Sequence, residues 1–239
     1  MKLLILICSL CLLFAGCKRG QQTGGTPSSG SNGVGGSGNA PAQALAQLEK
    51  GKQLYRDDQD SAATEAFQQA IQLDPDLPEA HFRLGLSYEA LNKAEEAEAE
   101  YRKAVESYKK YLESHDDDAE AHYNLGQTYA NLHQYTDAIR EYRQAVKLKE
   151  NDADMYYDLG MALTRLAQYN EAVSAFSKSL EIDPENYRAE DALEEAKEGV
   201  NRIRAGKKHQ EDLLKKQKEE ELKKAESGLP ATGAAKPTP

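Results

Sequence analysis

The sequence is poor in the residues that build catalytic and metal centres. Its 239 residues include no tryptophan and only three cysteines, and Cys8, Cys11 and Cys17 all fall within the first 17 positions. The chain after them has no thiol for a disulfide or a thiolate metal site. Between residues 44 and 186 it also lacks a Gly-rich phosphate loop, a Gly-x-Ser-x-Gly elbow and a His-Glu-x-x-His pair. We therefore expect a protein that is not an enzyme, with no cofactor, no metal and no small-molecule substrate.

The chain also lacks a surplus of positive charge. Its formal net charge is −10, and residues 44–186 hold 15 Lys and Arg against 29 Asp and Glu. Residues 187–226 carry the two signs in equal number. Binding to phosphate backbones requires concentrated Lys and Arg, so we expect no nucleic-acid partner.

The amino terminus has a short apolar run, over residues 3–14, after Met1-Lys2. A membrane-spanning helix needs about 20 apolar residues, so this pattern is typical of a signal peptide, here residues 1–16. The run ends in Leu13-Phe14-Ala15-Gly16-Cys17, which resembles a bacterial lipobox, although Phe14 stands where Leu is usual. The resemblance implies cleavage before Cys17 and lipid attachment to its thiol. An uncleaved signal anchor is the alternative.

The resemblance to lipoproteins also implies a location. It predicts a membrane-anchored lipoprotein of the cell envelope. Lys18 stands where Asp would signal inner-membrane retention in many Gram-negative bacteria, so the outer membrane, on its periplasmic side, is implied if the organism is Gram-negative. Residues 17–43 are rich in Gly, Ser, Thr, Gln and Asn, which predicts a lipidated cysteine followed by a flexible linker.

A sequence pattern recurs through the middle of the chain. Leu84-Gly85-x-x-Tyr88 returns as Leu125-Gly126-x-x-Tyr129 and as Leu159-Gly160-x-x-Leu163. Each is followed at a fixed distance by an alanine and an aromatic residue. The pattern resembles the tetratricopeptide repeat (TPR), a helix–turn–helix of 34 residues. The resemblance implies an all-α fold, a right-handed superhelical α-solenoid; a generic helical bundle is the alternative. The units are residues 44–77, 78–118, 119–152 and 153–186.

Local signals add detail to these units. The second unit is seven residues longer than 34, about two helical turns, so its second helix should run on to the loop Ser114–Asp118. The overhang either packs on a neighbouring helix or forms a partner surface. We expect the equivalent His81 and His122 to pack between helices, and residues 115–118 to cap a helix rather than bind a cation. Ser61, Thr136 and Asn170 are predicted N-caps.

The carboxyl-terminal part loses the Leu-Gly signature. Residues 187–226 keep helical spacing of a few apolar positions and then alternate Lys and Glu clusters. We expect a capping helix with a polar outer face, followed by a charged helix that is solvated or, alternatively, pairs as a coiled coil. Residues 227–239 are predicted to be a disordered tail.

The TPR resemblance also implies a binding site. In this family the first helix of each unit lines the concave face, with positions 2, 5, 9, 12 and 13 pointing inward. In units two, three and four, these positions are Glu79, Phe82, Leu86, Glu89 and Ala90; Glu120, Tyr123, Gln127, Ala130 and Asn131; and Asp154, Tyr157, Met161, Thr164 and Arg165. Position 5 is aromatic and position 2 acidic in all three units, which suits a peptide with apolar anchors and some positive charge. The alternative is that the three aromatic residues only pack in the core.

Together these features predict a protein–protein interaction scaffold. We expect a non-catalytic adaptor lipoprotein that holds a protein or peptide partner in the concave groove and reaches the membrane through its amino-terminal lipid. The alternative is an assembly lipoprotein of a secretion or type IV pilus apparatus, resembling the secretin pilotins. The carboxylate-clamp pattern of chaperone-binding TPR proteins is absent, since Leu48 and Lys52 stand at positions 5 and 9 of unit one.

Overall fold

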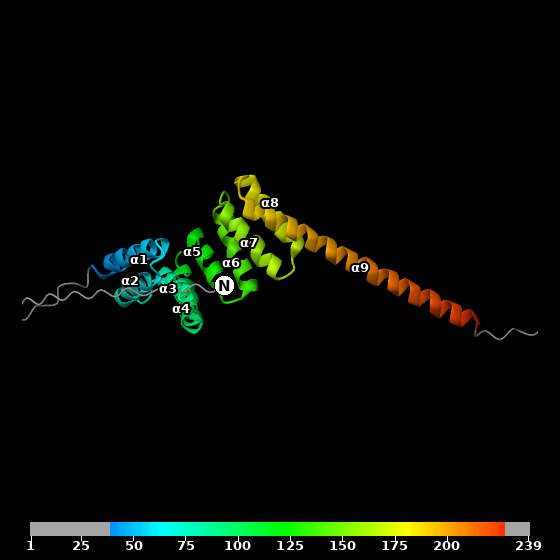
Figure 1. Cartoon of the computed structure of the whole chain (residues 1–239), viewed down its shortest axis with the longest axis horizontal. Helices are drawn as coiled ribbons and strands as arrows, with labels where there is room; N and C mark the ends of the chain where they lie inside the picture. The colour runs from blue at the N-terminus through cyan, green and yellow to red at the C-terminus, as the bar shows by residue number, and fades with distance from the viewer. Residues whose placement is uncertain (1–38, 228–239) are drawn as a thin grey trace, which may run out of the picture. The chain divides into compact units, whose positions relative to one another are not determined.

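The computed structural model describes residues 39–227, and this part of the chain consists of helices joined by short turns (Figure 1). The signal peptide, Cys17, most of the expected linker and the tail after residue 227 lie outside the described residues. In chain order the helices are α1 (Ala40–Arg56), α2 (Asp60–Leu73), α3 (Pro78–Ala90), α4 (Ala94–Leu112), α5 (Ala119–Asn131), α6 (Tyr135–Leu148), α7 (Ala153–Arg165), α8 (Tyr169–Ile182) and α9 (Tyr187–Ser227). None of them is long and apolar enough to cross a membrane.

The first eight helices form four consecutive helix–turn–helix units. Helix α1 packs on α2, α3 on α4, α5 on α6 and α7 on α8, and each pair packs on the next. Buried alanine and aromatic side chains fill the space between them, including Ala97, Tyr101, Ala138 and Tyr142. The predicted all-α solenoid of four repeats is confirmed.

Within each unit an aromatic ring occupies the space beside a glycine of the first helix. A Cβ atom at Gly85 would lie 2.5 Å from the Tyr101 ring, and one at Gly126 would lie 2.6 Å from the Tyr142 ring. The same contact joins Gly51 to Phe67 and Gly160 to Phe176. No side chain fits at these distances, so the glycine lets the two helices approach closely around the ring.

The turn inside each unit explains why the predicted N-caps are wrong. Ser61, Thr136 and Asn170 lie inside the first turns of α2, α6 and α8 rather than before them. The actual N-caps are Gln59, Lys93, Gln134 and Gln168, and none makes a side-chain cap. The preceding residues, Asp58, Asn92, His133 and Ala167, have φ values between 55° and 58°. The next backbone N–H then bonds to a carbonyl five residues back, as from Lys93 to Tyr88, so backbone bonds that end one helix also set the start of the next.

Two of the three turns between units use side-chain caps instead. Asp118 accepts a hydrogen bond from the Ala121 backbone N–H at 3.0 Å, and Asp152 accepts one from Met155 at 3.2 Å. The expected helix-capping role of residues 115–118 is therefore confirmed at Asp118. Among the described residues there is no cluster of His, Cys, Asp and Glu that could hold a metal ion.

The lengths of α4 and α1 test two of the expectations drawn from sequence spacing. Helix α4 has 19 residues against 14 in α6 and α8, which confirms the longer second helix. Its extension is packed, since Tyr108 is 3% exposed and the Tyr111 hydroxyl donates to Asp118. Helix α1 begins at Ala40, so the expected linker is too long by four residues. Pro41 lies in the first turn of α1, where its missing N–H costs no helical hydrogen bond.

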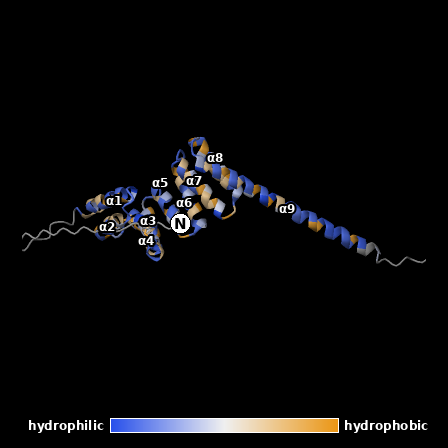
Figure 2. Cartoon of the chain, in the orientation of Figure 1, coloured by the Kyte–Doolittle hydropathy of each residue, from blue (hydrophilic) through white to orange (hydrophobic). Residues whose placement is uncertain are grey.

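The carboxyl-terminal region is one continuous helix of 41 residues rather than two. Its first part packs on α8: Ala189 and Ala196 are fully buried, and the Tyr169 ring lies 2.5 Å from where a Cβ at Gly199 would be. From residue 201 to residue 223 every residue is exposed. Figure 2 shows this part of α9 as mostly hydrophilic with isolated apolar residues. The first part of α9 thus caps the repeats with small residues that leave room for a neighbouring ring.

We expect Gly126→Ala to destabilise the fold, because the new Cβ would overlap the Tyr142 ring. Overpacking of this kind costs about 1–3 kcal/mol. Gly206→Ala is the matched control, since Gly206 lies within α9 with nothing within 4 Å of a Cβ, and alanine favours a helix by up to about 1 kcal/mol. Urea unfolding followed by circular dichroism measures both. Equal effects of the two substitutions would contradict the role of the glycine–aromatic contact.

Candidate functional site

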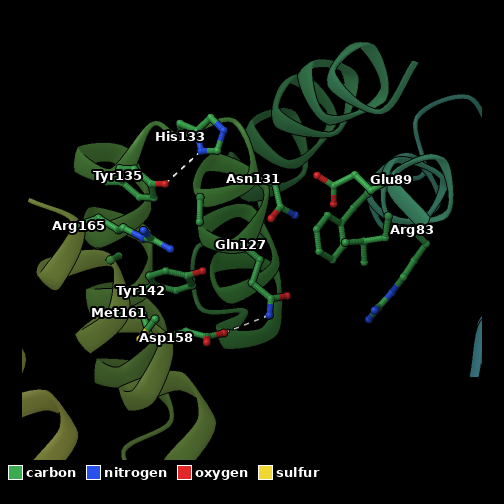
Figure 3. Close-up of a pocket in the computed structure, with 14 residues that line it drawn as sticks. Arg83, Glu89, Gln127, Asn131, His133, Tyr135, Tyr142, Asp158, Met161 and Arg165 are labelled. Carbon is green, nitrogen blue, oxygen red and sulfur yellow. Dashed lines mark hydrogen bonds between the residues drawn. The ribbon is translucent and has the colours of Figure 1, made fainter. Parts of the chain in front are cut away.

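A pocket of about 500 Å³ opens along the first helices of units two, three and four (Figure 3). Helices α3, α5 and α7 contribute most of its wall, and the start of α6 with the turn before it closes one end. The lining residues are Phe82, Arg83, Leu86, Glu89, Gln127, Ala130, Asn131, His133, Tyr135, Tyr142, Asp158, Met161, Ala162 and Arg165. The wall therefore combines apolar and aromatic side chains with charges of both signs.

About half of the residues predicted for the concave face line this pocket. From units two and three these are Phe82, Leu86, Glu89, Gln127, Ala130 and Asn131, and from unit four Met161 and Arg165. Glu79, Ala90, Glu120, Tyr123, Asp154, Tyr157 and Thr164 are not among the lining residues. The pocket thus brings together the predicted positions 9, 12 and 13 more than positions 2 and 5.

The aromatic residues at position 5 form a layer beneath the groove. Phe82 is 2% exposed, and its ring lies 6.2 Å from that of Tyr101. Tyr123 lies 5.8 Å from Tyr142, and Tyr157 and Phe176 make the same tilted contact in unit four. Each position-5 ring packs on the aromatic ring that faces the glycine of its own unit. This arrangement favours the core-packing alternative for their main role, with Phe82 also reaching the pocket wall.

The acidic residues at position 2 are paired inside the chain. Glu79 contacts Lys52 and Arg83, each at 3.1 Å. In the next two units Glu120 pairs with Lys149 at 2.8 Å, and Asp154 pairs with Arg188 at 3.0 Å. These ion pairs link neighbouring helices and neutralise much of the negative charge that the sequence placed on the concave face.

One acidic residue of the groove was missed by the sequence analysis. Asp158 is half-buried, and its Oδ2 accepts hydrogen bonds from the Tyr123 hydroxyl at 2.7 Å and the Gln127 side-chain amide at 3.2 Å. Burial raises the pKa of the Asp158 carboxyl above its ordinary value, and the two hydrogen bonds only partly oppose this rise. Burial and the nearby carboxylate also raise the pKa of Tyr123. The sequence did contain an indication of Asp158. It stands one position after the position-5 aromatic residue of its unit, where units two and three carry Arg83 and Asn124.

His81 and His122, which occupy equivalent repeat positions, contact other parts of the fold rather than the pocket. Nδ1 of His81 lies 2.7 Å from Glu100 on α4, and Nε2 lies 3.0 Å from the Pro75 carbonyl. His122 repeats both contacts in unit three, with Glu141 and the Asp116 carbonyl. Each ring thus ties a first helix to a second helix and to the preceding turn. Their expected packing between helices is confirmed.

Comparisons with known proteins agree with this architecture. Models of the tetratricopeptide repeat match residues 76–151 and 123–187, and a model described as TPR repeat matches residues 51–92. A search of the curated proteins found no match.

Several solved structures share the fold. A crystal structure of MamA protein is 27% identical, with a TM-score of 0.51, and the match covers 84% of this chain and all of that one. The APC/C hetero-tetramer Cut9-Hcn1 is 25% identical with a TM-score of 0.54, over 64% of this chain and 30% of that one. Pseudomonas aeruginosa pilF is 19% identical with a TM-score of 0.53, over 66% and 69%, and shows the fold alone. Proteins of this architecture generally act as non-catalytic interaction scaffolds with a concave binding surface. The chain belongs to the tetratricopeptide repeat family.

Proposed function

We propose that this protein is a non-catalytic adaptor that holds a segment of a partner protein in the groove of α3, α5 and α7, and that a lipid on Cys17 attaches it to an envelope membrane. The observation that carries the groove assignment is the pocket of about 500 Å³ with the half-buried Asp158 on its wall. Its volume is in the range of ligand-binding clefts, and a few placed polar groups among apolar ones give such clefts their specificity.

The energetic cost of Asp158 supports a binding role. A carboxylate that is partly removed from water without a cation partner destabilises the folded state. A residue with this cost in a cleft is typical of functional sites, where stability is lost in exchange for recognition. Packing alone would be served as well by an uncharged residue that accepts the same two hydrogen bonds.

The membrane attachment rests on the sequence. Leu13-Phe14-Ala15-Gly16-Cys17 resembles a lipobox after a short apolar run, and the 22 residues between Cys17 and Ala40 form a Gly- and Ser-rich spacer. Since one acyl chain binds a membrane only marginally, the two or three chains that the lipoprotein resemblance implies make the attachment stable. The spacer would let the repeats meet a partner at a distance from the lipid surface.

We expect Asp158→Asn to raise the free energy of unfolding at pH 7 by about 0.5–1 kcal/mol. Asparagine still accepts from Tyr123 and Gln127 through its oxygen but carries no charge. Because the pKa of Asp158 is raised in the folded state, the native protein takes up its proton first as the pH falls. The advantage of the variant should therefore shrink between pH 7 and pH 4. Asp154 and Arg188 from the same side of the groove also act on this carboxyl, in opposite directions.

Chemical unfolding of both proteins across this pH range measures the difference. A variant that is less stable than the wild type at pH 7 would show that Asp158 is a structural residue.

We expect a photoreactive residue in the groove to capture the partner in living cells. Benzoylphenylalanine at Met161, which lines the pocket, should form a cross-linked adduct, whereas the same residue at the exposed Ser177 of α8 should not. Equal adducts at both positions, or an adduct at Ser177 alone, would place the binding surface elsewhere. A secretin or pilus subunit in the Met161 adduct would identify the protein as an assembly lipoprotein.

We expect cells fed an alkyne fatty acid to label the wild-type protein and not Cys17→Ser. The thiol of Cys17 is the atom that the lipobox resemblance assigns to the lipid. Fractionation of the same cells provides a second readout, because the variant should leave the membrane fraction. Equal labelling of the two proteins would disprove the anchor and leave the groove assignment untouched.

A further inference from the structure

Asp158 differs from the acidic residues at position 2 of units two to four, and from Glu89, which also accepts from a tyrosine hydroxyl but is exposed. Glu79, Glu120 and Asp154 each lie within 3.1 Å of a basic nitrogen. Asp158 makes no ion pair with any described residue, and its two hydrogen-bond donors are neutral. Arg188, whose positive charge acts on this carboxyl, bonds instead to Asp154 and lies over the Tyr157 ring. The groove therefore contains a carboxylate that has no cation partner among the residues that the structure describes.

The geometry leaves one face of this carboxylate available. Both hydrogen bonds from α5 end on Oδ2, so Oδ1 has no hydrogen-bond partner among the described residues. Asp158 itself lines the pocket, and Figure 3 shows its carboxylate at the pocket wall beside Gln127 and Met161. Tyr123 and Gln127 thus fix the orientation of a carboxylate on the pocket wall and leave its Oδ1 as an acceptor without a donor among the described residues.

Arg165 provides the opposite charge on the same helix. It lines the pocket, is exposed, and makes no ion pair or hydrogen bond with the described residues. Seven residues separate it from Asp158, so both lie on one face of α7, about 10 Å apart along the helix axis. Met161 and Ala162 line the pocket between them. Along α7 the pocket wall therefore presents, in order, an acidic, an apolar and a basic side chain.

We propose that the groove binds an extended segment of a partner protein that places a lysine or arginine side chain against Asp158 and an aspartate or glutamate side chain against Arg165, with an apolar residue between them against Met161. This inference rests on the proposed function. A chain in the extended polyproline II conformation advances about 3.1 Å per residue and has three residues per turn, so two charged residues on one side of it are three positions apart. The complementary charges also set the direction of the segment along α7, because the reversed pattern would place like charges together.

The two contacts should differ in strength. The contact at Asp158 is partly shielded from water and involves an oriented acceptor, so it should dominate and persist at high salt. The contact at Arg165 is exposed and should weaken as ionic strength rises. This difference predicts that the basic residue of the segment is required and that the acidic residue only improves affinity.

A phage-displayed library of random dodecapeptides tests the inference, with the soluble protein from residue 18 onward as bait. Selected peptides are synthesised and their affinities measured by fluorescence anisotropy. We expect enrichment of a basic residue three positions from an acidic one. Asp158→Asn should weaken these peptides at least tenfold at both 50 mM and 500 mM salt, and Arg165→Gln two- to five-fold at 50 mM only. The matched controls are Glu65→Gln and Lys147→Gln, which remove exposed charges on α2 and α6.

A pocket-filling variant separates the inference from the function on which it rests. Ala130→Trp should abolish binding by occupying the pocket, with circular dichroism as the check on folding. Peptides that lose binding on Ala130→Trp but show no basic residue, or that bind Asp158→Asn as tightly as wild type, would overturn the inference and leave the groove as the binding site. Failure to select any peptide sensitive to a folded Ala130→Trp would overturn both.

Discussion

In every repeat an aromatic ring fills the space that a side chain at the facing glycine would need, and the rest of the structure depends on this contact. It sets where along their length the two helices of a unit come closest, as at Gly85 and Tyr101. The same ring then supports the position-5 aromatic residue of the first helix, so the contact also sets the level of the groove floor. Helix α9 uses the contact in reverse, with Gly199 accepting the Tyr169 ring of α8. The same steric contact therefore holds each repeat together and joins α9 to the last repeat.

Polar contacts then hold the first helices at their correct angle to the turns. His81 and His122 each reach both a glutamate of the second helix and a carbonyl of the preceding turn. The hydrogen bonds from His81 and Lys103 hold the pKa of the half-buried Glu100 below its ordinary value, even though burial acts against them. Unit four has Tyr156 in place of the histidine, and there the Ser179 hydroxyl donates to the Ala153 carbonyl instead. A different residue thus ties the two helices of unit four together.

The concave face carries separate positive and negative charges rather than a uniformly acidic surface. Most of its acids are neutralised by basic residues from neighbouring helices, which contributes to the joints between units more than to ligand binding. Asp158 and Arg165 remain as single charges on one face of α7, separated by apolar side chains. A surface of this kind distinguishes ligands by the order of their charges, which a uniform acidic patch does not do.

The sequence by itself determined the repeat, its four units and the longer α4, because these follow from the spacing of glycine, alanine and aromatic residues along single helices. That the first helices form the groove wall was implied by the resemblance to the TPR family. It missed the caps of α2, α6 and α8, because backbone bonds in left-handed turns replace side-chain caps there. It missed the start of α1 because Pro41 is compatible with the first turn of a helix. Only the tertiary structure decided which concave acids are paired. Lys149 reaches Glu120 from the end of α6, and Arg188 reaches Asp154 from α9, whereas no cation within residues 39–227 pairs with Asp158. Charge pairing depends on contacts between residues about thirty positions apart in the chain, and the sequence pattern does not give the distance between their side chains in space.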